Sequence, residues 1–289
     1  MTRAAVKPSV PRAPDPAPAT RVRCRQIADG DLDALAGLLA EGFAHTGMDY
    51  WRRGFARAAL LPPVEGMPRF GYALESEKGL VGALLLFSSR RGTRIFANLS
   101  SWYVRPSHRA HAGMLVAMAT KLRHVTYVNI SPAPHTWQTL SAQGFKPYNF
   151  GRSAVMPLLG LRGGKITPEI PPSLPDAELL AAHRAMGCTV VTWEKKGEVL
   201  PFVFRPRRLE HPPVKVMELI YCRGTEDFRR AGPALGRHFL KSGAGGFLLD
   251  GKVPGMPGHY VDGKEPRYYR GPHAPNLNDL AFTEKVIFG

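Results

Sequence analysis

The sequence predicts an α/β protein of the α+β type with a mixed β-sheet flanked by helices, and three observations support this fold class. Residues 80–87 are apolar on both faces, as expected of a central strand that helices cover. An apolar strand at residues 95–104 leads through a short loop into a helix at residues 108–122, which precedes a further strand at residues 124–130. The order hairpin, strand, helix, strand then occurs a second time, which predicts two tandem copies of one unit.

The first unit is expected to begin after a proline-rich tail. Residues 1–20 hold five prolines among alanine and basic residues, a composition typical of an extended or disordered segment. Residues 22–27 follow as a short strand, and Asp31 is placed to cap a helix with a stripe of leucines. A second helix at residues 48–60 stops before Pro62, because proline cannot donate the helical hydrogen bond. A hairpin follows, and its second strand is the doubly apolar segment described above.

The second half of the chain follows the same order. Its expected elements are a helix at 176–186, a hairpin with strands at 188–193 and 199–205, a strand at 214–222, a helix at 226–242 and a strand at 246–250. Both hairpins turn at a Lys-Gly pair that enters an apolar strand, although hairpins are common and chance similarity is an alternative. The expected organisation is a disordered tail at 1–20, a first unit at 21–160, a linker at 161–175 and a degenerate second unit at 176–289.

Composition narrows the class of protein. The chain of 289 residues has no run of about eighteen apolar residues, so we expect no transmembrane helix and no insertion into a membrane. The three cysteines are odd in number and far apart in sequence, which favours a reducing cytoplasm and argues against a cysteine metal site. The net charge is +16, and the chain without its first 23 residues, which hold five basic and one acidic residue, still carries +12. Such an excess is typical either of a basic surface that aids solubility or of an anionic partner such as a nucleotide cofactor, tRNA or a membrane surface.

The strand-to-helix junction at residues 104–114 carries the clearest chemical signal. Backbone N–H groups converge at a helix N-terminus, and the helix dipole favours negative charge there, so the junction predicts a site for a phosphate-bearing cofactor. His108 and His111 have a spacing that could face a metal, but no carboxylate or thiol cluster accompanies them, and we expect no metal site. The residues expected to bind the cofactor are Tyr103, Val104, Arg109, Ala110, His111, Ala112, Gly113 and Met114.

The order of elements and this junction resemble the GNAT superfamily of acyl-CoA-dependent N-acyltransferases, which shows a Val-x-Pro-x-x-Arg-Gly-x-Gly-x-Gly/Ala run. Val104, Pro106 and Arg109 match the run, whereas alanine and methionine stand where small residues, mostly glycine, are usual, and the one glycine is displaced by one position. The resemblance covers residues 22–158 well and residues 176–289 weakly. It implies acetyl-CoA or another acyl-CoA as co-substrate, and transfer of the acyl group to a small-molecule or peptide amine.

The resemblance also points to candidate catalytic residues. A Gly-Phe pair at residues 144–145 matches the end of the family's second motif, but Leu140 replaces the tyrosine that often protonates the leaving thiolate. Tyr148 or water then has to donate that proton. His135 is the candidate base, because an unperturbed histidine has a pKa suited to proton transfer near neutrality, although a lone histidine is often structural. Asn98 is the candidate that holds the amine through water, and a structural hydrogen bond is the alternative.

The second half lacks the phosphate-binding features of the first. Its strand at 214–222 is not followed by a Pro-x-x-Arg loop, and Glu226 and Asp227 occupy the start of the next helix, where they would repel pyrophosphate. We therefore expect one acyl-CoA per chain, bound by the first half, with residues 176–289 supplying acceptor contacts. A polar and aromatic C-terminal patch is expected to line the acceptor site or to cover a sheet edge; its members are Asp250, His259, Tyr260, Asp262, Tyr268 and Tyr269.

Two other functions are open on the sequence alone. Tandem GNAT-like halves with a basic surface also resemble peptidyltransferases that take an aminoacyl group from tRNA, and a steep loss of affinity with salt would identify this class. Leu140 and the lack of a convincing base favour a non-catalytic acyl-CoA-binding module, which would bind acyl-CoA without releasing thiol. Nucleic acid is a partner only under the first of these alternatives.

Overall fold

The structure is a computed structural model that describes residues 21–156, 163–210 and 213–289. The first half contains β1 (Arg23–Gln26), α1 (Leu32–Gly42), α2 (Met48–Ala58), β2 (Gly71–Ser76), β3 (Gly79–Arg91), β4 (Arg94–Val104), α3 (Ala112–Ala119), β5 (Val125–Asn129), α4 (Trp137–Ala142) and β6 (Lys146–Val155). The second half contains β7 (Lys165–Thr167), α5 (Ala177–Ala185), β8 (Thr189–Lys195), β9 (Glu198–Arg208), β10 (Lys215–Tyr221), α6 (Thr225–Lys241), β11 (Phe247–Asp250), β12 (Gly258–Arg270) and α7 (Glu284–Ile287). Three short 3-10 helices precede α1, α3 and α4, namely η1 (Asp29–Asp31), η2 (Pro106–His111) and η3 (Pro134–Thr136).

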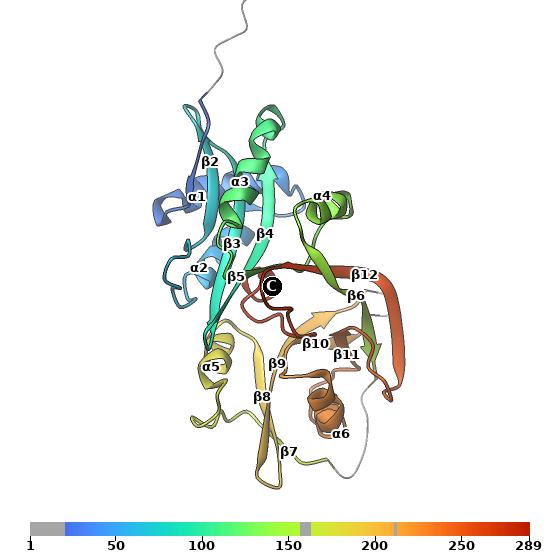
Figure 1. The fold of residues 1–289 in the computed structure, drawn as a ribbon. Helices are drawn as coiled ribbons and strands as arrows, with labels where there is room; N and C mark the ends of the chain where they lie inside the picture. Colours follow the sequence, from blue (N-terminus) through green and yellow to red (C-terminus); the bar gives the residue numbers. More distant parts are fainter. Residues whose placement is uncertain (1–20, 157–162, 211–212) are drawn as a thin grey trace, which may run out of the picture.

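All strands of the described ranges form one mixed sheet in the order β1-β2-β3-β4-β5-β12-β6-β11-β10-β9-β8-β7 (Figure 1). In each half an antiparallel hairpin leads to an inner strand that pairs in parallel with the strand after the next helix, β4 with β5 and β10 with β11. The predicted fold class is therefore confirmed, and the repeated order of elements is also a repeat of sheet topology.

The two halves exchange their last long strands. β12 of the second half lies between β5 and β6 and is antiparallel to both. β6 of the first half lies between β12 and β11 and is antiparallel to β11. Figure 1 shows the red β12 beside the green β6, where the two halves meet. The sequence analysis did not predict this exchange, because these pairings join segments that are far apart in the chain and leave no local pattern.

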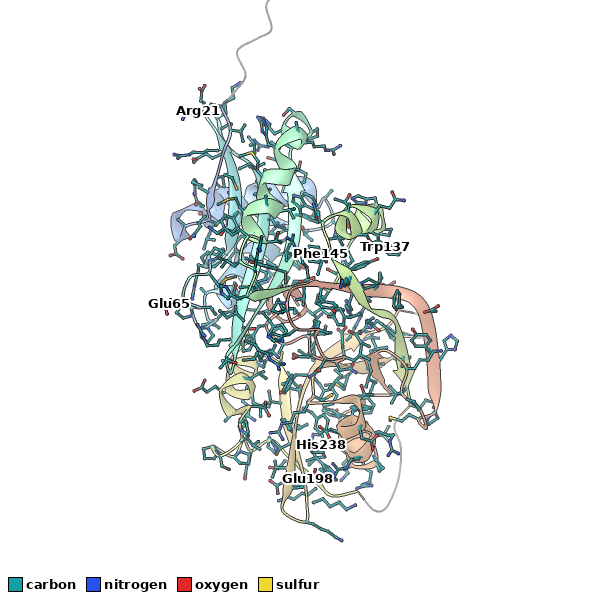
Figure 2. All side chains as sticks on the ribbon, in the orientation of Figure 1. Arg21, Glu65, Trp137, Phe145, Glu198 and His238 are labelled. Carbon is teal, nitrogen blue, oxygen red and sulfur yellow. The ribbon has the colours of Figure 1, made fainter. Side chains whose placement is uncertain are left out.

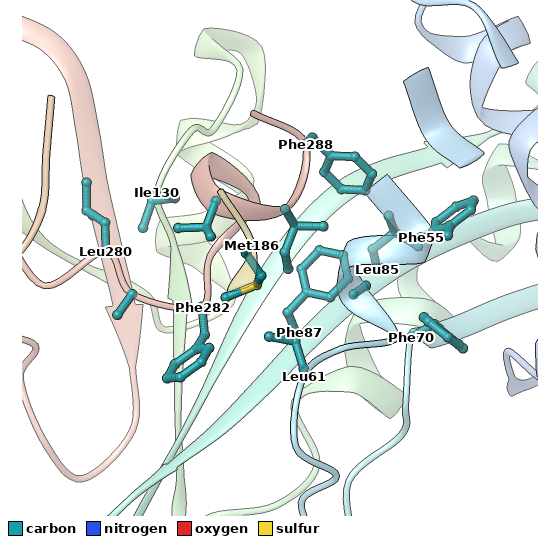
Figure 3. Close-up of a cluster of buried hydrophobic side chains, with 14 of the residues drawn as sticks. Phe55, Leu61, Phe70, Leu85, Phe87, Ile130, Met186, Leu280, Phe282 and Phe288 are labelled. Atoms are coloured by element: carbon teal, nitrogen blue, oxygen red, sulfur yellow. The ribbon is translucent and has the colours of Figure 1, made fainter. Parts of the chain in front are cut away.

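Helices cover both faces of the sheet, and side chains fill the space between them (Figure 2). α1, α2, α5 and α7 lie on one face, where a single cluster of buried residues draws on both halves of the chain. Figure 3 shows Phe55 and Phe87 of the first half beside Met186, Phe282 and Phe288 of the second. α3 and α4 cover the other face of the first half, and α6 covers that face of the second. The shared cluster makes the C-terminal segment part of the core of the first half.

Two local expectations were wrong. In place of one helix at residues 108–122, η2 leads into α3, which ends where the Thr120 hydroxyl donates to the backbone carbonyl of Val116. Asp31 makes no capping hydrogen bond to α1, because its carboxylate accepts from the Arg25 guanidinium and from the backbone N–H of Ala28. The carboxylate of Asp31 thus forms an ion pair with Arg25 of β1 in place of the predicted cap.

Several expectations concern the limits of the chain. The predicted tail at residues 1–20 lies outside the described residues. The segment expected to link the two units contains β7, which pairs with β8, and the division of the chain at that segment stays a prediction. Among the described residues, no helix combines the length and the apolar character needed to cross a membrane.

Candidate functional site

β4 and β5 separate near their C-terminal ends. They pair in parallel as far as Asn98 and Val128, after which β5 ends while β4 continues to Val104. A cavity of about 880 Å³ lies at this separation, bordered by β4, α3, α4, the segment between α1 and α2, and α7. Because β3 occupies the other edge of β4, the edge that faces the cavity has no backbone partner among the described residues. A bound ligand can therefore hydrogen-bond to the backbone of β4.

A β-bulge on β4 lies in the wall of this cavity. Ser101 and Trp102 together face the single residue Leu84 of β3, and all three border the cavity. Ser101 has a φ of 51°, in the left-handed region that costs energy for any residue with a side chain. A bulge leaves one residue out of the strand ladder, so a backbone N–H group becomes available to a ligand here. Strained residues of this kind are typical of functional sites.

The predicted cofactor-binding residues line one side of the cavity or lie next to it. Those that border the cavity are Tyr103, Val104, Arg109 and Ala112, while Ala110, His111, Gly113 and Met114 continue the same backbone from η2 into α3. Neither η2 nor the first turn of α3 contains an acidic residue. Arg105 donates to both carboxylate oxygens of Glu41, at 2.9 and 2.7 Å, whereas Arg109 has no ion-pair partner among the described residues. Arg109 is thus the cation left for an anionic ligand.

The three candidate catalytic residues lie in different surroundings. His135 is exposed in η3 and borders the cavity. Asn98 is buried and does not border it; its amide group donates to two backbone carbonyls at 3.3 Å and accepts from the backbone N–H of Glu284 at 2.9 Å. Tyr148 of β6 also lies outside the cavity wall, and burial raises the pKa of its hydroxyl, which has no hydrogen-bond partner in the described structure. Of the three, His135 alone reaches the cavity.

Among the described residues that border the cavity, Glu284 is the one acidic residue, and the sequence did not predict it. It begins α7, where the hydrogen bond from its backbone N–H to Asn98 fixes its position. The Ser131 hydroxyl donates to Oε1 at 2.5 Å, whereas Oε2 is buried without a partner in the described structure. Burial raises the pKa of Glu284 above its ordinary value of 4.5, and the hydrogen bond from Ser131 opposes this shift. A glutamate in the first turn of a helix is common, so the sequence gives no signal for Glu284, and only these contacts identify it as a candidate site residue.

Four of the twelve buried side-chain polar atoms without a partner in the described structure belong to residues that border the cavity. Trp51 and Trp102 each have an unpartnered indole N–H, and Gln143 and Glu284 each have an unpartnered side-chain oxygen, as far as the described residues show. All four residues border the cavity. Because buried polar atoms in proteins are nearly always hydrogen-bonded, these four atoms are available to a ligand with polar groups.

The corresponding place in the second half is filled by the chain itself. β10 and β11 pair only as far as Glu218, and β10 also carries a bulge, at Ile220. Beyond that point the C-terminal segment lies against β10. The Leu280 N–H donates to the carbonyl of Ile220 at 2.8 Å, and the Cys222 N–H donates to the carbonyl of Asn278 at 3.2 Å. The edge that is free in the first half is thus paired in the second.

Asn278 holds this C-terminal segment in place. It is 1% exposed and has a φ of 63°, in the left-handed region that asparagine tolerates better than most residues. Its side chain accepts from the Asp250 N–H at 2.7 Å and donates to the Asp250 carbonyl at 3.2 Å and to the Thr225 hydroxyl at 3.3 Å. The segment then continues into α7, near the C label in Figure 1. The C-terminal segment therefore pairs with the edge of β10 in the second half, and it also supplies Glu284 to the cavity of the first half.

A buried network of charges anchors α7. Lys285 donates to Glu218 at 2.7 Å and to Glu265 at 2.9 Å, and Arg152 donates to the same two carboxylates at 2.5 and 3.0 Å. Burial would raise the pKa of Glu218, but the charges of Lys285 and Arg152 outweigh it and hold the pKa at about 2. Because several ion pairs share these groups, the network fixes Lys285 and, next to it in the chain, Glu284.

The C-terminal patch predicted for the acceptor site does not border the cavity. Its Asp250 accepts two hydrogen bonds from Arg267 at 3.0 Å, and its Tyr268 and Tyr269 belong to the part of β12 that pairs with β5 and β6. The described residues contain no group of three or more side chains that could hold a metal ion. His108, one of two histidines considered for a metal, pairs through Nδ1 with the Ser107 hydroxyl at 2.9 Å.

Comparison with known proteins identifies the fold. No protein-family model matches the chain, and no curated protein matches its sequence. A protein of Pyrococcus horikoshii, described provisionally as an acetyltransferase, matches with a TM-score of 0.57 and 12% identity over 94% of this chain and 96% of its own. Two GCN5-related N-acetyltransferases match too. One from Anabaena variabilis matches with a TM-score of 0.57 and 12% identity over 86% of this chain and 72% of its own. One from Kribbella flavida matches with a TM-score of 0.53 and 14% identity over 87% of this chain and 71% of its own. The chain thus has the fold of the GCN5-related N-acetyltransferases, as the sequence resemblance implied.

Proposed function

We propose that the protein is an acyltransferase that moves an acyl group, acetyl in the simplest case, from acyl-CoA to an amine acceptor. The observation that carries this proposal is the cavity at the separation of β4 and β5, which combines a free strand edge, a bulge and the buried carboxylate of Glu284. These are the groups that an uncatalysed aminolysis of a thioester lacks: a template, a donor for the carbonyl oxygen and a base.

Acyl-CoA suits the residues that surround the cavity. Its amide-bearing arm needs backbone partners, which the free edge of β4 offers, and its phosphates need donors and positive charge. Arg109, which has no ion-pair partner among the described residues, offers both, and no carboxylate lies in η2 or in the first turn of α3. Ala110, Ala112 and Met114 replace the usual glycines, but α3 begins in regular helical geometry, so the backbone there does not depend on glycine.

Each step of the proposed chemistry has a group in the cavity wall. A backbone N–H group at the Ser101 bulge donates to the carbonyl oxygen of the thioester, where negative charge develops as the amine attacks. Glu284 accepts the amine proton directly or through a water molecule, and Asn98 and Ser131 keep its carboxylate in position. The thiolate leaves and takes a proton from solvent or from His135, because Leu140 cannot donate one.

In this proposal each chain binds one acyl-CoA, in the first half. The backbone edge of β10 that would receive a second molecule is already paired with Asn278 and Leu280. In addition, Glu226 and Asp227 place two carboxylates in the first turn of α6, where pyrophosphate would have to lie. Residues from the second half nevertheless complete the site, since Arg205 and α7 border the same cavity.

The test is to titrate the full chain with acetyl-CoA by calorimetry and to follow thiol release over a broad panel of amines. We expect one binding site and release of thiol that depends on an amine. Binding without release for every amine would instead identify a non-catalytic acyl-CoA-binding module. Absence of binding to acetyl-CoA and to longer acyl-CoA molecules would refute the proposal as a whole.

A further inference from the structure

Arg205 borders the cavity and has no counter-ion among the residues that the structure describes. It lies in β9 and borders the same cavity as Glu284. Its guanidinium group donates one hydrogen bond, at 2.5 Å, to the backbone carbonyl of Lys285. Within the described ranges it takes part in no ion pair. Because a guanidinium group carries a fork of donors, most of its hydrogen-bonding capacity is left for another partner.

The neighbouring charges are balanced without Arg205. Lys285 pairs with Glu218 and Glu265, and Arg207, two residues along the same strand, lies 3.7 Å from each of these carboxylates. Glu284 is the sole acidic residue among those that border the cavity, and it forms no ion pair with Arg205. Besides Arg109, which lies in η2, the cavity thus offers one carboxylate and, separately, the guanidinium group of Arg205, which is uncompensated as far as the described residues show. This arrangement suits a ligand that carries both signs of charge.

The hydrogen bond from Arg205 to the carbonyl of Lys285, the residue after Glu284, places the two charges at the same end of the cavity, which Tyr50 also borders. Burial raises the pKa of its hydroxyl; the charge of Arg205 opposes this shift, and the charge of Glu284 adds to it. Both charges therefore act on the Tyr50 hydroxyl. The ring of Tyr50 stacks on Phe288 with 5.7 Å between centroids and meets Trp51 edge-on at 5.2 Å. This end of the cavity combines a base, a cation and an aromatic wall.

We propose that the amine acceptor also carries a carboxylate group and that Arg205 binds this carboxylate. The inference rests on the proposed acyltransferase function and names the acceptor class as amino carboxylates, such as free amino acids. A guanidinium group binds a carboxylate through two parallel hydrogen bonds, which orients the acceptor as well as holding it. An acceptor without an anion leaves the partly buried Arg205 unsatisfied, and a diamine places a second positive charge against it.

The experiment compares matched ligands by calorimetry on the full chain in the presence of CoA. The probes are phenylalanine, its amide and phenethylamine, together with alanine, its amide and ethylamine; an aminoalkyl phosphate separates a carboxylate from a phosphate site. We expect the amino acid of at least one set to bind about tenfold or more tighter than its neutral or cationic counterparts. Arg205→Gln should abolish this difference, and Arg205→Lys should keep part of it. Arg208→Gln, an exposed change in the same strand, should leave it intact.

The outcomes separate this inference from the proposed function. Equal binding within every set, no binding of either amino acid, or unchanged discrimination in Arg205→Gln would overturn the inference. Tighter binding of the aminoalkyl phosphate would overturn the choice of a carboxylate. Selective binding of an amino acid with no thiol release from acetyl-CoA would count against acyl transfer, while the role of Arg205 would stand. In an active enzyme, Arg205→Gln should raise KM for the amino acid and leave KM for acyl-CoA unchanged.

Discussion

Replacement of Glu284 by glutamine tests the proposed base with little disturbance of the structure. The amide has the shape of the carboxylate and can still accept the hydrogen bond from Ser131, which is 2.5 Å long in the native structure. The hydrogen bond from the backbone N–H of Glu284 to Asn98 does not involve the side chain and should persist. Glu284→Gln therefore removes the proton-accepting group and keeps the position of α7.

The expected loss of activity in Glu284→Gln depends on which other groups at the cavity can accept a proton. General base catalysis contributes about 100-fold to 10,000-fold, and no second carboxylate of the described residues borders the cavity to replace Glu284. His135 is exposed and is a poor substitute, so we expect kcat to fall by about 100-fold or more. KM for acyl-CoA should change by no more than about twofold, because Glu284 acts on the amine rather than on CoA.

The pH dependence gives a second signature. The carboxylate must be ionised to accept a proton, and burial raises its pKa above 4.5, so activity should increase with pH through that raised pKa. Glu284→Gln should lose this increase. Stability should move the other way: the folded state disfavours the charged carboxylate, so it loses stability as pH rises from 4.5 through the raised pKa. The amide avoids this penalty, so Glu284→Gln should melt higher than wild type at pH 8, and the gain should vanish near pH 4.5.

The assay is thiol release from acetyl-CoA at several pH values, with a thermal melt of each variant. Glu178→Gln is the matched control, because Glu178 is also a first-turn glutamate of a helix but is exposed and lies outside the cavity. It should change neither rate nor pH profile. If Glu284→Gln keeps wild-type kcat and the same pH profile while it folds normally, Glu284 is not the base and the reasoning fails.

Further predictions concern the cofactor side, the C-terminal segment and the tail. Arg109→Glu should weaken acetyl-CoA binding by about tenfold or more, since attraction between residue 109 and the phosphates becomes repulsion. Unchanged affinity in calorimetry would show that Arg109 does not contact the phosphates. Calorimetry on the wild type should find one acetyl-CoA per chain; two equivalent sites would mean that the segment around Asn278 does not block the second cleft. Asn278→Ala should lower the free energy of unfolding by about 2–3 kcal/mol in denaturant melts, because it leaves buried groups of Asp250 unpaired. A chain that starts at Thr20 should keep its melting temperature within about 2 °C, and a larger drop would show that the tail packs on the body.

Local patterns predicted most elements of each half, because each has its own sequence signal. The apolar segment at residues 80–87 is part of β3, and the predicted helix at 226–242 is α6 within one residue at each end. The cofactor-binding residues were predicted for the same reason: they lie close together in sequence, and a strand that leads into a helix start is recognisable without the rest of the fold. Their binding role stays a prediction. Four of the eight border the cavity.

The catalytic candidates could not be settled in this way, because their roles depend on contacts between distant segments. Asn98 was expected at the amine, but in the fold it is satisfied by neighbouring backbone and by Glu284. Tyr148 was expected to protonate the thiolate, but β6 carries it into the part of the sheet shared with β12, away from the cavity wall. Their part in catalysis stays a prediction that the structure does not support by position.

The sequence by itself determined the fold class, the tandem order of elements and the place of the junction that is expected to bind an anion, since periodicity, turn residues and a helix start are properties of short segments. The tertiary structure alone decided how the halves are joined and which residues complete the site. Long-range hydrogen bonds and a buried core that both halves share determine three features of the structure. These are the exchange of β6 and β12, the pairing of Asn278 and Leu280 with β10, and the position of Glu284 near β4. Such contacts are selected by the free energy of the whole folded chain, so no window of the sequence contains them.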